Sequence, residues 1–319
     1  MMTQRPTIDA QHRRRTEDGD TPSSSAERTL VVRAPAKINW VLDLLDRRAD
    51  GYHELETVAS CITLADEVTL AATASSPSIT LTCTDASLPT DEANLAFRAA
   101  VVLARRAGVR AGASIHLKKR VPVGAGLGGG SSDAAAVLRG LNALWGLDWP
   151  IARLLPLAAA LGSDVPLLLA GGTGIARGRG EFVEPVRFSW PGVIVVAMPG
   201  LYVSTRDVYA DVRPDDLRVV SHAGKAFADG QSASRWSACD LLSRCRNGLE
   251  AAAFRRFPDL REWSQRLCGR FDRAWRLCGS GSSFFTAWDD EAEAEVCVRI
   301  IRTEMGIRAE PARLADVDA

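Results

Sequence analysis

Apolar and polar positions in the first half of the chain follow two periods, one typical of strands and one typical of helices. Residues 30–44 and 58–71 are patterned as extended chain, and residues 113–117 form a shorter strand pattern. Apolar side chains recur at helical spacing over residues 94–107 and 131–145, and each of these segments ends at a glycine. The pattern therefore predicts strands interleaved with helices.

The pattern changes after a glycine-rich, hairpin-like segment at residues 171–180. Residues 192–198 form a continuous apolar run rich in β-branched side chains, which is typical of a buried strand. Residues 211–240 are polar and only weakly periodic. The last third adds three predicted helices and one strand, at residues 249–257, 261–271, 291–305 and 284–288. The predicted fold class is α+β, in two layered parts.

The change in composition near residue 185 predicts two domains, at residues 29–185 and 186–319. Residues 1–28 precede them and lack the apolar region of a signal peptide. Their acidic side chains also argue against an organelle transit peptide. We interpret this first segment as a disordered polar tail.

Composition narrows the class of protein. The chain has 319 residues, of which 46% are apolar and 24% charged, so fibrous and mainly disordered proteins are excluded. Its 39 basic and 39 acidic residues cancel, which argues against partners such as nucleic acid or an anionic membrane. The most apolar stretches, at residues 154–161 and 165–176, are shorter than the ~20 residues that span a bilayer. Any anionic ligand must therefore be bound by local geometry.

The seven cysteines are scattered along the chain and form no C-x-x-C pair. This pattern argues against a disulfide framework and against a zinc site. Reduced thiols in a cytoplasmic protein are the better interpretation. The four histidines likewise give no metal-binding pattern, so we name no protein ligand for a metal.

The most distinctive segment is a glycine loop at residues 122–132, which has five glycines within seven residues and directly precedes a predicted helix. Glycines allow the backbone to approach a ligand closely, and the free N–H groups at a helix start attract phosphate. Ser131 and Ser132 add hydroxyl donors in the first turn. A plain flexible turn capped by one of these serines is the alternative. The glycine density favours phosphate binding.

Two other phosphate-binding motifs can be compared with this loop. Gly124, Gly126 and Gly129 match G-x-G-x-x-G, and Asp148 lies where a ribose-binding acid would be expected, so a dinucleotide-dependent oxidoreductase is an alternative. Against it, the loop comes after about 120 residues instead of opening the domain. A P-loop of the G-x-x-x-x-G-K-[ST] type is excluded because no lysine follows the glycines. A catalytic cation must come from elsewhere.

Two further segments carry charged side chains in apolar surroundings. Lys37 and Asn39 lie two residues apart in a predicted strand, so their side chains share one face. A lone strand lysine is more often a solvated edge residue. Asp164 lies in the segment G-S-D-V-P, where it could simply cap a short helix that has Pro166 in its first turn. Taken singly, each residue has an ordinary structural explanation.

Taken together, these segments resemble the GHMP kinases, which include galactokinase, homoserine kinase, mevalonate kinase and phosphomevalonate kinase. P-A-K-I-N at residues 35–39, the glycine loop, L-G-S-D-V-P at 161–166 and C-G-S-G-S-S-F-F at 278–285 occur in the order of the family. The stretch D-R-R-A-D-G-Y-H-E-L at residues 46–55 resembles the branch that acts on a cytidine-diphosphate-linked polyol in the non-mevalonate isoprenoid pathway. This ten-residue match is the most specific signal in the sequence.

The resemblance implies a fold and a set of site residues. The fold is the two-domain α+β GHMP kinase fold, with an N-terminal α/β (ribosomal S5-like) domain that binds ATP and a C-terminal ferredoxin-like domain, the site lying in the cleft between them. The implied catalytic pair is Lys37 and Asp164. The implied ATP phosphate loop is Pro122, Val123, Gly124, Ala125, Gly126, Leu127, Gly128, Gly129, Gly130, Ser131 and Ser132. The implied substrate-binding residues are Asn39, Tyr52, His53, Thr205 and Tyr209.

The implied reaction is ATP-dependent phosphorylation of an alcohol, with Mg²⁺ bound to the ATP. The two small-molecule substrates are ATP and the cytidine-diphosphate-linked polyol. Tyr52 and Tyr209 suit stacking on the cytosine, and His53 suits hydrogen bonding to its edge. Another substrate of the same family and a catalytically silent binding module remain alternatives.

Overall fold

The computed structural model describes residues 28–73, 76–218, 224, 227 and 235–315. All of the predicted tail at 1–28 except Arg28 lies outside the described residues, and so does much of the polar segment at 211–240. Within the described part of the chain, no helix is long and apolar enough to cross a membrane.

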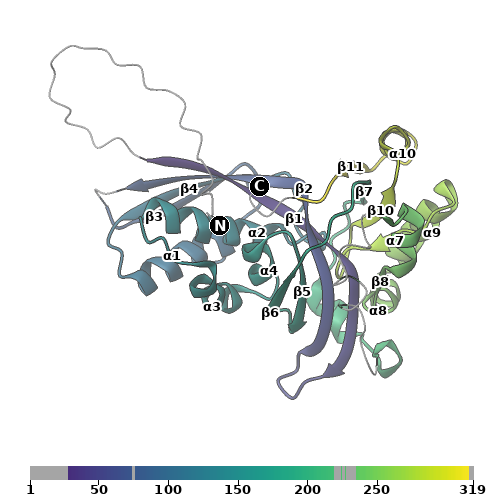
Figure 1. Cartoon of the computed structure of the whole chain (residues 1–319), viewed down its shortest axis with the longest axis horizontal. Coiled ribbons are helices and arrows are strands. Elements are labelled where there is room, and N and C mark those ends of the chain that lie inside the picture. Colours follow the sequence, from purple (N-terminus) through teal and green to yellow (C-terminus); the bar gives the residue numbers. More distant parts are fainter. Residues whose placement is uncertain (1–27, 74–75, 219–223, 225–226, 228–234, 316–319) are drawn as a thin grey trace, which may run out of the picture.

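A long antiparallel hairpin, β1 (Thr29–Arg47) paired with β2 (His53–Thr73), is the centre of the molecule (Figure 1). The first residues of β1 alternate between exposed and partly buried positions, whereas residues 36–44 are all buried. A strand that is covered on both faces needs an unbroken run of buried side chains. The later half of β1 is therefore enclosed, and this is the half that carries Lys37 and Asn39.

The hairpin belongs to a sheet in the order β3, β4, β2, β1, β8, with a second hairpin attached to β2 through β5. The remaining strands of this sheet are β3 (Ile79–Cys83), β4 (Gly112–Lys118), β5 (Thr173–Gly178), β6 (Phe182–Val186) and β8 (Arg246–Asn247). The helices of this half are α1 (Leu95–Ala107), α2 (Gly129–Leu144), α3 (Ile151–Leu161) and α4 (Val165–Ala170). Helix α2 packs against β1 and β2 and also contacts α1 and α4, so it is held against the hairpin.

Two helix boundaries show how the sequence sets local structure. Helix α1 begins after Asn94, whose side chain accepts a hydrogen bond from the Ala96 N–H, and ends at Gly108 in a left-handed conformation, as predicted. Helix α2 begins at Gly129, two residues earlier than predicted, because Gly128 adopts a left-handed φ of 73° at the N-cap. Neither Ser131 nor Ser132 caps this helix, so the plain capped-turn alternative is wrong.

A second, four-stranded antiparallel sheet has the order β11, β7, β10, β9. Its strands are β7 (Val193–Met198), β9 (Arg276–Leu277), β10 (Phe284–Trp288) and β11 (Arg308–Ala312). The helical segments of this half are α5 (Thr205–Ala210), η1 (Pro214–Asp216), α7 (Ala238–Arg244), α8 (Glu250–Arg256), α9 (Pro258–Phe271) and α10 (Glu291–Thr303). Every residue of the central strand β7 is buried, which agrees with the apolar run at 192–198.

The two halves share a packed junction. Trp40 of β1 is fully buried, and its ring meets the ring of Phe285 from β10 edge to face, with centroids 5.5 Å apart. Strand β8 comes from the second half of the sequence but pairs in parallel with β1. These contacts fix the two sheets relative to one another. The boundary at residues 185 and 186 stays a prediction.

Candidate active site

A cleft of about 1150 Å³ lies along the junction of the two halves. The wall of this cleft includes residues from β1, the start of β2, the glycine loop, the segment before α4 and helix α5. Every site residue implied by the sequence motifs lines it except Ser132. Segments far apart in the sequence, from Lys37 to Ser280, thus meet at one place.

Lys37 is only 4% exposed and is held by a chain of hydrogen bonds along the hairpin. Its Nζ donates to Asn39 Oδ1 at 2.7 Å, and Asn39 Nδ2 donates to Thr57 Oγ1 at 2.8 Å. Thr57 in turn donates to the carbonyl oxygen of Val41 at 2.7 Å. The solvated-edge explanation for Lys37 is therefore wrong. The ammonium group has a fixed position at the base of the cleft.

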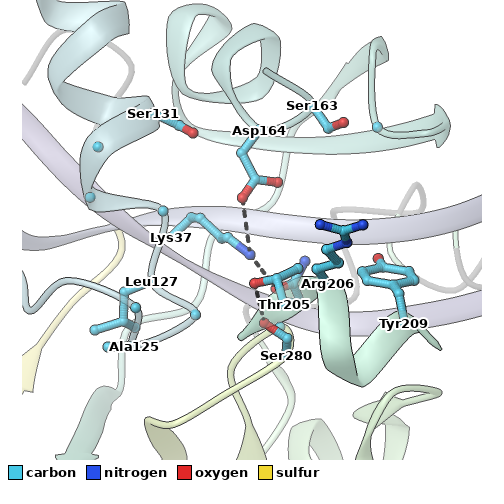
Figure 2. A pocket seen from close by; sticks show the side chains of 18 of the residues that line it. Lys37, Ala125, Leu127, Ser131, Ser163, Asp164, Thr205, Arg206, Tyr209 and Ser280 are labelled. Carbon is cyan, nitrogen blue, oxygen red and sulfur yellow. Dashed lines mark hydrogen bonds and ion pairs between the residues drawn. The ribbon is translucent and has the colours of Figure 1, made fainter. Parts of the chain in front are cut away.

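Asp164 precedes helix α4 and has Pro166 in the first turn of that helix, as the capping explanation requires. Its side chain makes no capping hydrogen bond, however, and instead turns toward Lys37 (Figure 2). The Asp164 Oδ2 atom lies 3.6 Å from Lys37 Nζ, and the Asp164 side chain is 47% exposed. The pair thus combines a buried cation with a carboxylate that remains open to the cleft.

The glycine loop is clamped between the hairpin and the turn that precedes β10. The Lys37 N–H donates to the Leu127 carbonyl oxygen at 2.9 Å, and the Ser283 N–H donates to the Ala125 carbonyl oxygen at 3.1 Å. Gly126 has a φ of +74°, and a Cβ atom there would lie 1.8 Å from the Cys278 carbonyl oxygen. Only glycine fits at this position.

The far end of the loop faces open space. A Cβ atom at Gly130 would meet no atom of the described residues within 4 Å, and both Gly130 and Ser131 line the cleft at the start of α2. Free backbone N–H groups and the positive end of the helix dipole are therefore presented to the cleft, as phosphate binding requires. Ser132 lies beneath this surface, and its buried hydroxyl has no hydrogen-bond partner within the described part of the chain.

Aromatic side chains gather on the hairpin side of the cleft. Tyr52 is 55% exposed, and the guanidinium carbon of Arg179 lies 4.7 Å from its ring centroid. The ring centroids of His53 and Tyr209 are 5.5 Å apart. Burial, together with the charge of Arg47, lowers the pKa of His53, so its imidazole is neutral at neutral pH. Burial and the nearby Asp164 carboxylate raise the pKa of Tyr209.

Thr205 at the start of α5 lies against the turn before β10. Its Oγ1 atom is 2.7 Å from the Oγ atom of Ser280, and both residues line the cleft (Figure 2). The motif C-G-S-G-S-S-F-F therefore contributes to the cleft wall. This motif was recognised in the sequence, but none of its residues was predicted to belong to the site.

Sequence reasoning missed a second lysine in the cleft wall, Lys119. Its Nζ lies 2.5 Å from Asp66 Oδ2 and 2.6 Å from Asp133 Oδ2, and all three side chains are buried. Burial raises the pKa of Asp133 to about 7, against the opposing effect of the Lys119 charge. The basic stretch around Lys119 was visible in the sequence, but its two carboxylate partners lie 53 and 14 residues away.

Known proteins are similar to this chain over most of its length. Residues 94–172 match the family model described as GHMP kinases N terminal domain. A protein of Shouchella clausii (strain KSM-K16) named 4-diphosphocytidyl-2-C-methyl-D-erythritol kinase is 36% identical over 277 residues, covering 87% of this chain and 90% of the relative. A protein of the same name from Pelotomaculum thermopropionicum is 40% identical, covering 86% of this chain and 95% of the relative.

Solved structures of known proteins are also similar to this chain. A crystal structure of 4-(cytidine 5'-diphospho)-2C-methyl-D-erythritol kinase has a TM-score of 0.74 and 36% identity, covering 90% of this chain and all of that one. A homoserine kinase from Cytophaga hutchinsonii has a TM-score of 0.68 at 18% identity, covering 93% of this chain and 98% of that one. The second likeness concerns the fold alone.

Proposed function

The chain belongs to the 4-diphosphocytidyl-2-C-methyl-D-erythritol kinases within the GHMP kinases, and from this we infer that it transfers the γ-phosphoryl group of ATP to the 2-hydroxyl of 4-diphosphocytidyl-2-C-methyl-D-erythritol. This reaction belongs to the non-mevalonate route to isoprenoid precursors. The predicted family, the two-domain α+β fold and the kinase activity are confirmed. Family membership argues against the dinucleotide-dependent oxidoreductase.

The single observation that carries the mechanism is the meeting of Lys37, Asp164 and the start of α2 in one cleft. Asp164 orients the acceptor hydroxyl and accepts its proton as the bond to phosphorus forms. Lys37 lies beside the Asp164 carboxylate and stabilises the negative charge on the transferred group. The hydrogen bond from Lys37 to Asn39 supports this proposal, because it holds the ammonium in place before substrate arrives.

The glycine loop from Pro122 to Ser131 binds the ATP phosphates through its backbone N–H groups and the start of α2. The cleft fits Mg²⁺ that would be bound mainly by phosphate oxygens, and the Ser131 hydroxyl and the Asp164 carboxylate of the lining would be available to hold it. When bound, Mg²⁺ neutralises phosphate charge. Among the described residues, no group of three or more His, Cys, Asp or Glu side chains could hold a metal on its own.

The cytosine end of the substrate binds near Tyr52, His53 and Tyr209. The exposed Tyr52 ring offers a stacking surface, and neutral His53 offers a hydrogen bond to the base edge. Thr205, which is anchored by Ser280, lies at the boundary between this region and the phosphate loop. We retain all of these residues, together with Asn39, as proposed substrate contacts.

The direct test is a steady-state assay of the purified chain with Mg·ATP and 4-diphosphocytidyl-2-C-methyl-D-erythritol. We expect ADP release that depends on the acceptor and a phosphorylated product. Methylerythritol without the cytidylyl group serves as the control acceptor and should give no more than background turnover. Homoserine and mevalonate test the other acceptors of the family. Comparable turnover of either one would contradict the substrate assignment.

A further inference from the structure

The proposed substrate contains a negatively charged diphosphate, for which neither the catalytic pair nor the glycine loop provides hydrogen-bond donors. Its diphosphate carries about two negative charges and lies between the cytosine and the alcohol that is phosphorylated. The backbone N–H groups of the glycine loop are engaged by the phosphates of ATP. The diphosphate therefore needs its own donors between Asp164 and the aromatic residues of the cleft.

Arg179 lies in this interval. Its guanidinium group is stacked over Tyr52 at 4.7 Å, at the cytosine end. The next residue, Gly180, packs on the residue before Asp164, since a Cβ atom at Gly180 would lie 3.1 Å from the Ser163 carbonyl oxygen. Arg179 thus connects the base end to the reacting end. Its ion pair is a long one, 3.7 Å from Nε to Glu181 Oε1, and leaves the terminal nitrogens of the guanidinium able to donate.

Arg206 approaches the same interval from helix α5. It is the neighbour of Thr205 and lies one turn from Tyr209, whose pKa is raised in part by the charge of Asp164. Figure 2 shows the Arg206 guanidinium reaching into the cleft beside Tyr209. This side chain is exposed and lines the cleft, and it makes no hydrogen bond or ion pair with any residue that the structure describes.

We propose that Arg179 and Arg206 form a two-sided clamp for the diphosphate of the cytidylylated substrate. The planar guanidinium groups suit bidentate hydrogen bonding to phosphate oxygens. One arginine comes from the β5–β6 turn and the other from α5, so the two halves of the molecule each contribute one cation. The clamp rests on the proposed function, and it makes the diphosphate, as well as the cytosine, a determinant of specificity.

The test uses Arg179→Gln, Arg206→Gln and the double variant in the full chain. We expect each single change to raise KM for the cytidylylated substrate about tenfold and the double change to raise it further, with KM for ATP altered less than about twofold. Arg153→Gln is the matched control, because Arg153 also stacks on an aromatic ring, that of Trp149 at 3.6 Å, but does not line the cleft. Arg153→Gln should leave KM for the cytidylylated substrate and KM for ATP unchanged.

Calorimetric binding of CDP and of cytidine separates the clamp from a merely structural role and requires no turnover. Removing either arginine should weaken CDP by about tenfold and cytidine by less than about twofold, and added salt should weaken CDP binding more in the wild type than in the double variant. Equal losses for CDP and cytidine in Arg179→Gln would mean that Arg179 only supports Tyr52. Unchanged CDP binding in both variants would refute the clamp. Failure of the proposed function would appear separately, as a wild type that binds CDP but does not turn over the substrate.

Discussion

Two buried lysines, Lys119 and Lys37, line the same cleft but have opposite surroundings. Lys119 is paired with two carboxylates at 2.5 and 2.6 Å, and the side chains of these partners, Asp66 and Asp133, are 0% and 4% exposed. Lys37 lies at the longer distance of 3.6 Å from the Asp164 carboxylate, and almost half of the Asp164 side chain is exposed. The charge of Lys119 is balanced by buried carboxylates of the protein, whereas the charge of Lys37 remains accessible to a ligand in the cleft.

The difference separates the charges that build the cleft from those to which we assign a role in the proposed mechanism. Besides binding Lys119, the Asp66 carboxylate accepts hydrogen bonds from the backbone N–H groups of Arg120 and Val121, directly before the glycine loop. The Lys119 cluster thus positions the chain that enters the loop. Lys37 is held by a neutral partner, Asn39, so its charge remains available to phosphate oxygens. The close ion pairs of Lys119 thus support the structure of the cleft, whereas the longer ion pair of Lys37 is compatible with the proposed catalytic role.

The largest effect should come from removing the open carboxylate. We expect Asp164→Ala to lower kcat about a thousandfold, because the acceptor hydroxyl loses the group that orients it and accepts its proton. KM for ATP should change little, since the glycine loop is untouched. Steady-state kinetics with both substrates varied gives the two constants. Equal losses in kcat and in ATP binding would place Asp164 in the nucleotide site instead.

Removing each lysine in turn should separate the two surroundings by stability. Lys119→Met leaves two buried carboxylates without their cation, and we expect the free energy of unfolding to fall by about 3 to 5 kcal/mol. Lys37→Met leaves one carboxylate that water already reaches, so its loss of stability should be less than half as large. Urea denaturation of both variants measures this. Similar losses would mean that the two pairs do not differ as described.

Local sequence motifs were sufficient to name residues that meet in one cleft, whereas the roles assigned to them stay predictions. Lys37, Asp164 and the glycine loop were named from short segments, and the structure brings all three to one cleft. The end of helix α1 was predicted correctly because Gly108 is a recognisable cap, and its start was predicted one residue early, at the N-cap Asn94.

What the sequence could not supply depends on contacts between distant segments or on backbone conformation. Helix α3 was not predicted, and Pro156 lies inside it, where a proline is ordinarily unfavourable to a helix. Strand β11 was missed because it is short, contains Pro311 and depends on pairing with the distant strand β7. The partners of Lys119 and the positions of Arg179 and Arg206 follow from the fold, since no spacing along the chain encodes them.

Two residues of the glycine loop, Gly126 and Gly130, allow a similar comparison for the backbone. Gly126 is packed against the protein, whereas Gly130 faces the open cleft. Gly126→Ala should lower the free energy of unfolding by about 2 kcal/mol, because the residue has a positive φ and its Cβ would collide with the Cys278 carbonyl oxygen. Gly130→Ala should leave stability unchanged or slightly higher, since alanine favours the helix. It should raise KM for ATP, because the new methyl group enters the cleft. A destabilised Gly130→Ala, or a Gly126→Ala as stable as the wild type, would contradict this division.

The smallest expected effect is the pH dependence of stability that arises from protonation of Asp133, one of the two carboxylates beside Lys119. The pKa of Asp133 is raised to about 7 in the folded chain from its ordinary 3.8, so between these values the folded state binds a proton that the unfolded state has released. The stability from this group is therefore present below about pH 3.8 and is lost as the pH rises through about 7. Asp133→Asn has no such proton but keeps an oxygen for Lys119. We expect the wild type to lose at least about 1 kcal/mol relative to this variant between pH 5 and pH 8, measured by urea denaturation at each pH. Parallel pH profiles would mean that Asp133 is ionised throughout, and that Lys119 neutralises both of its carboxylates more completely than the burial of Asp133 indicates.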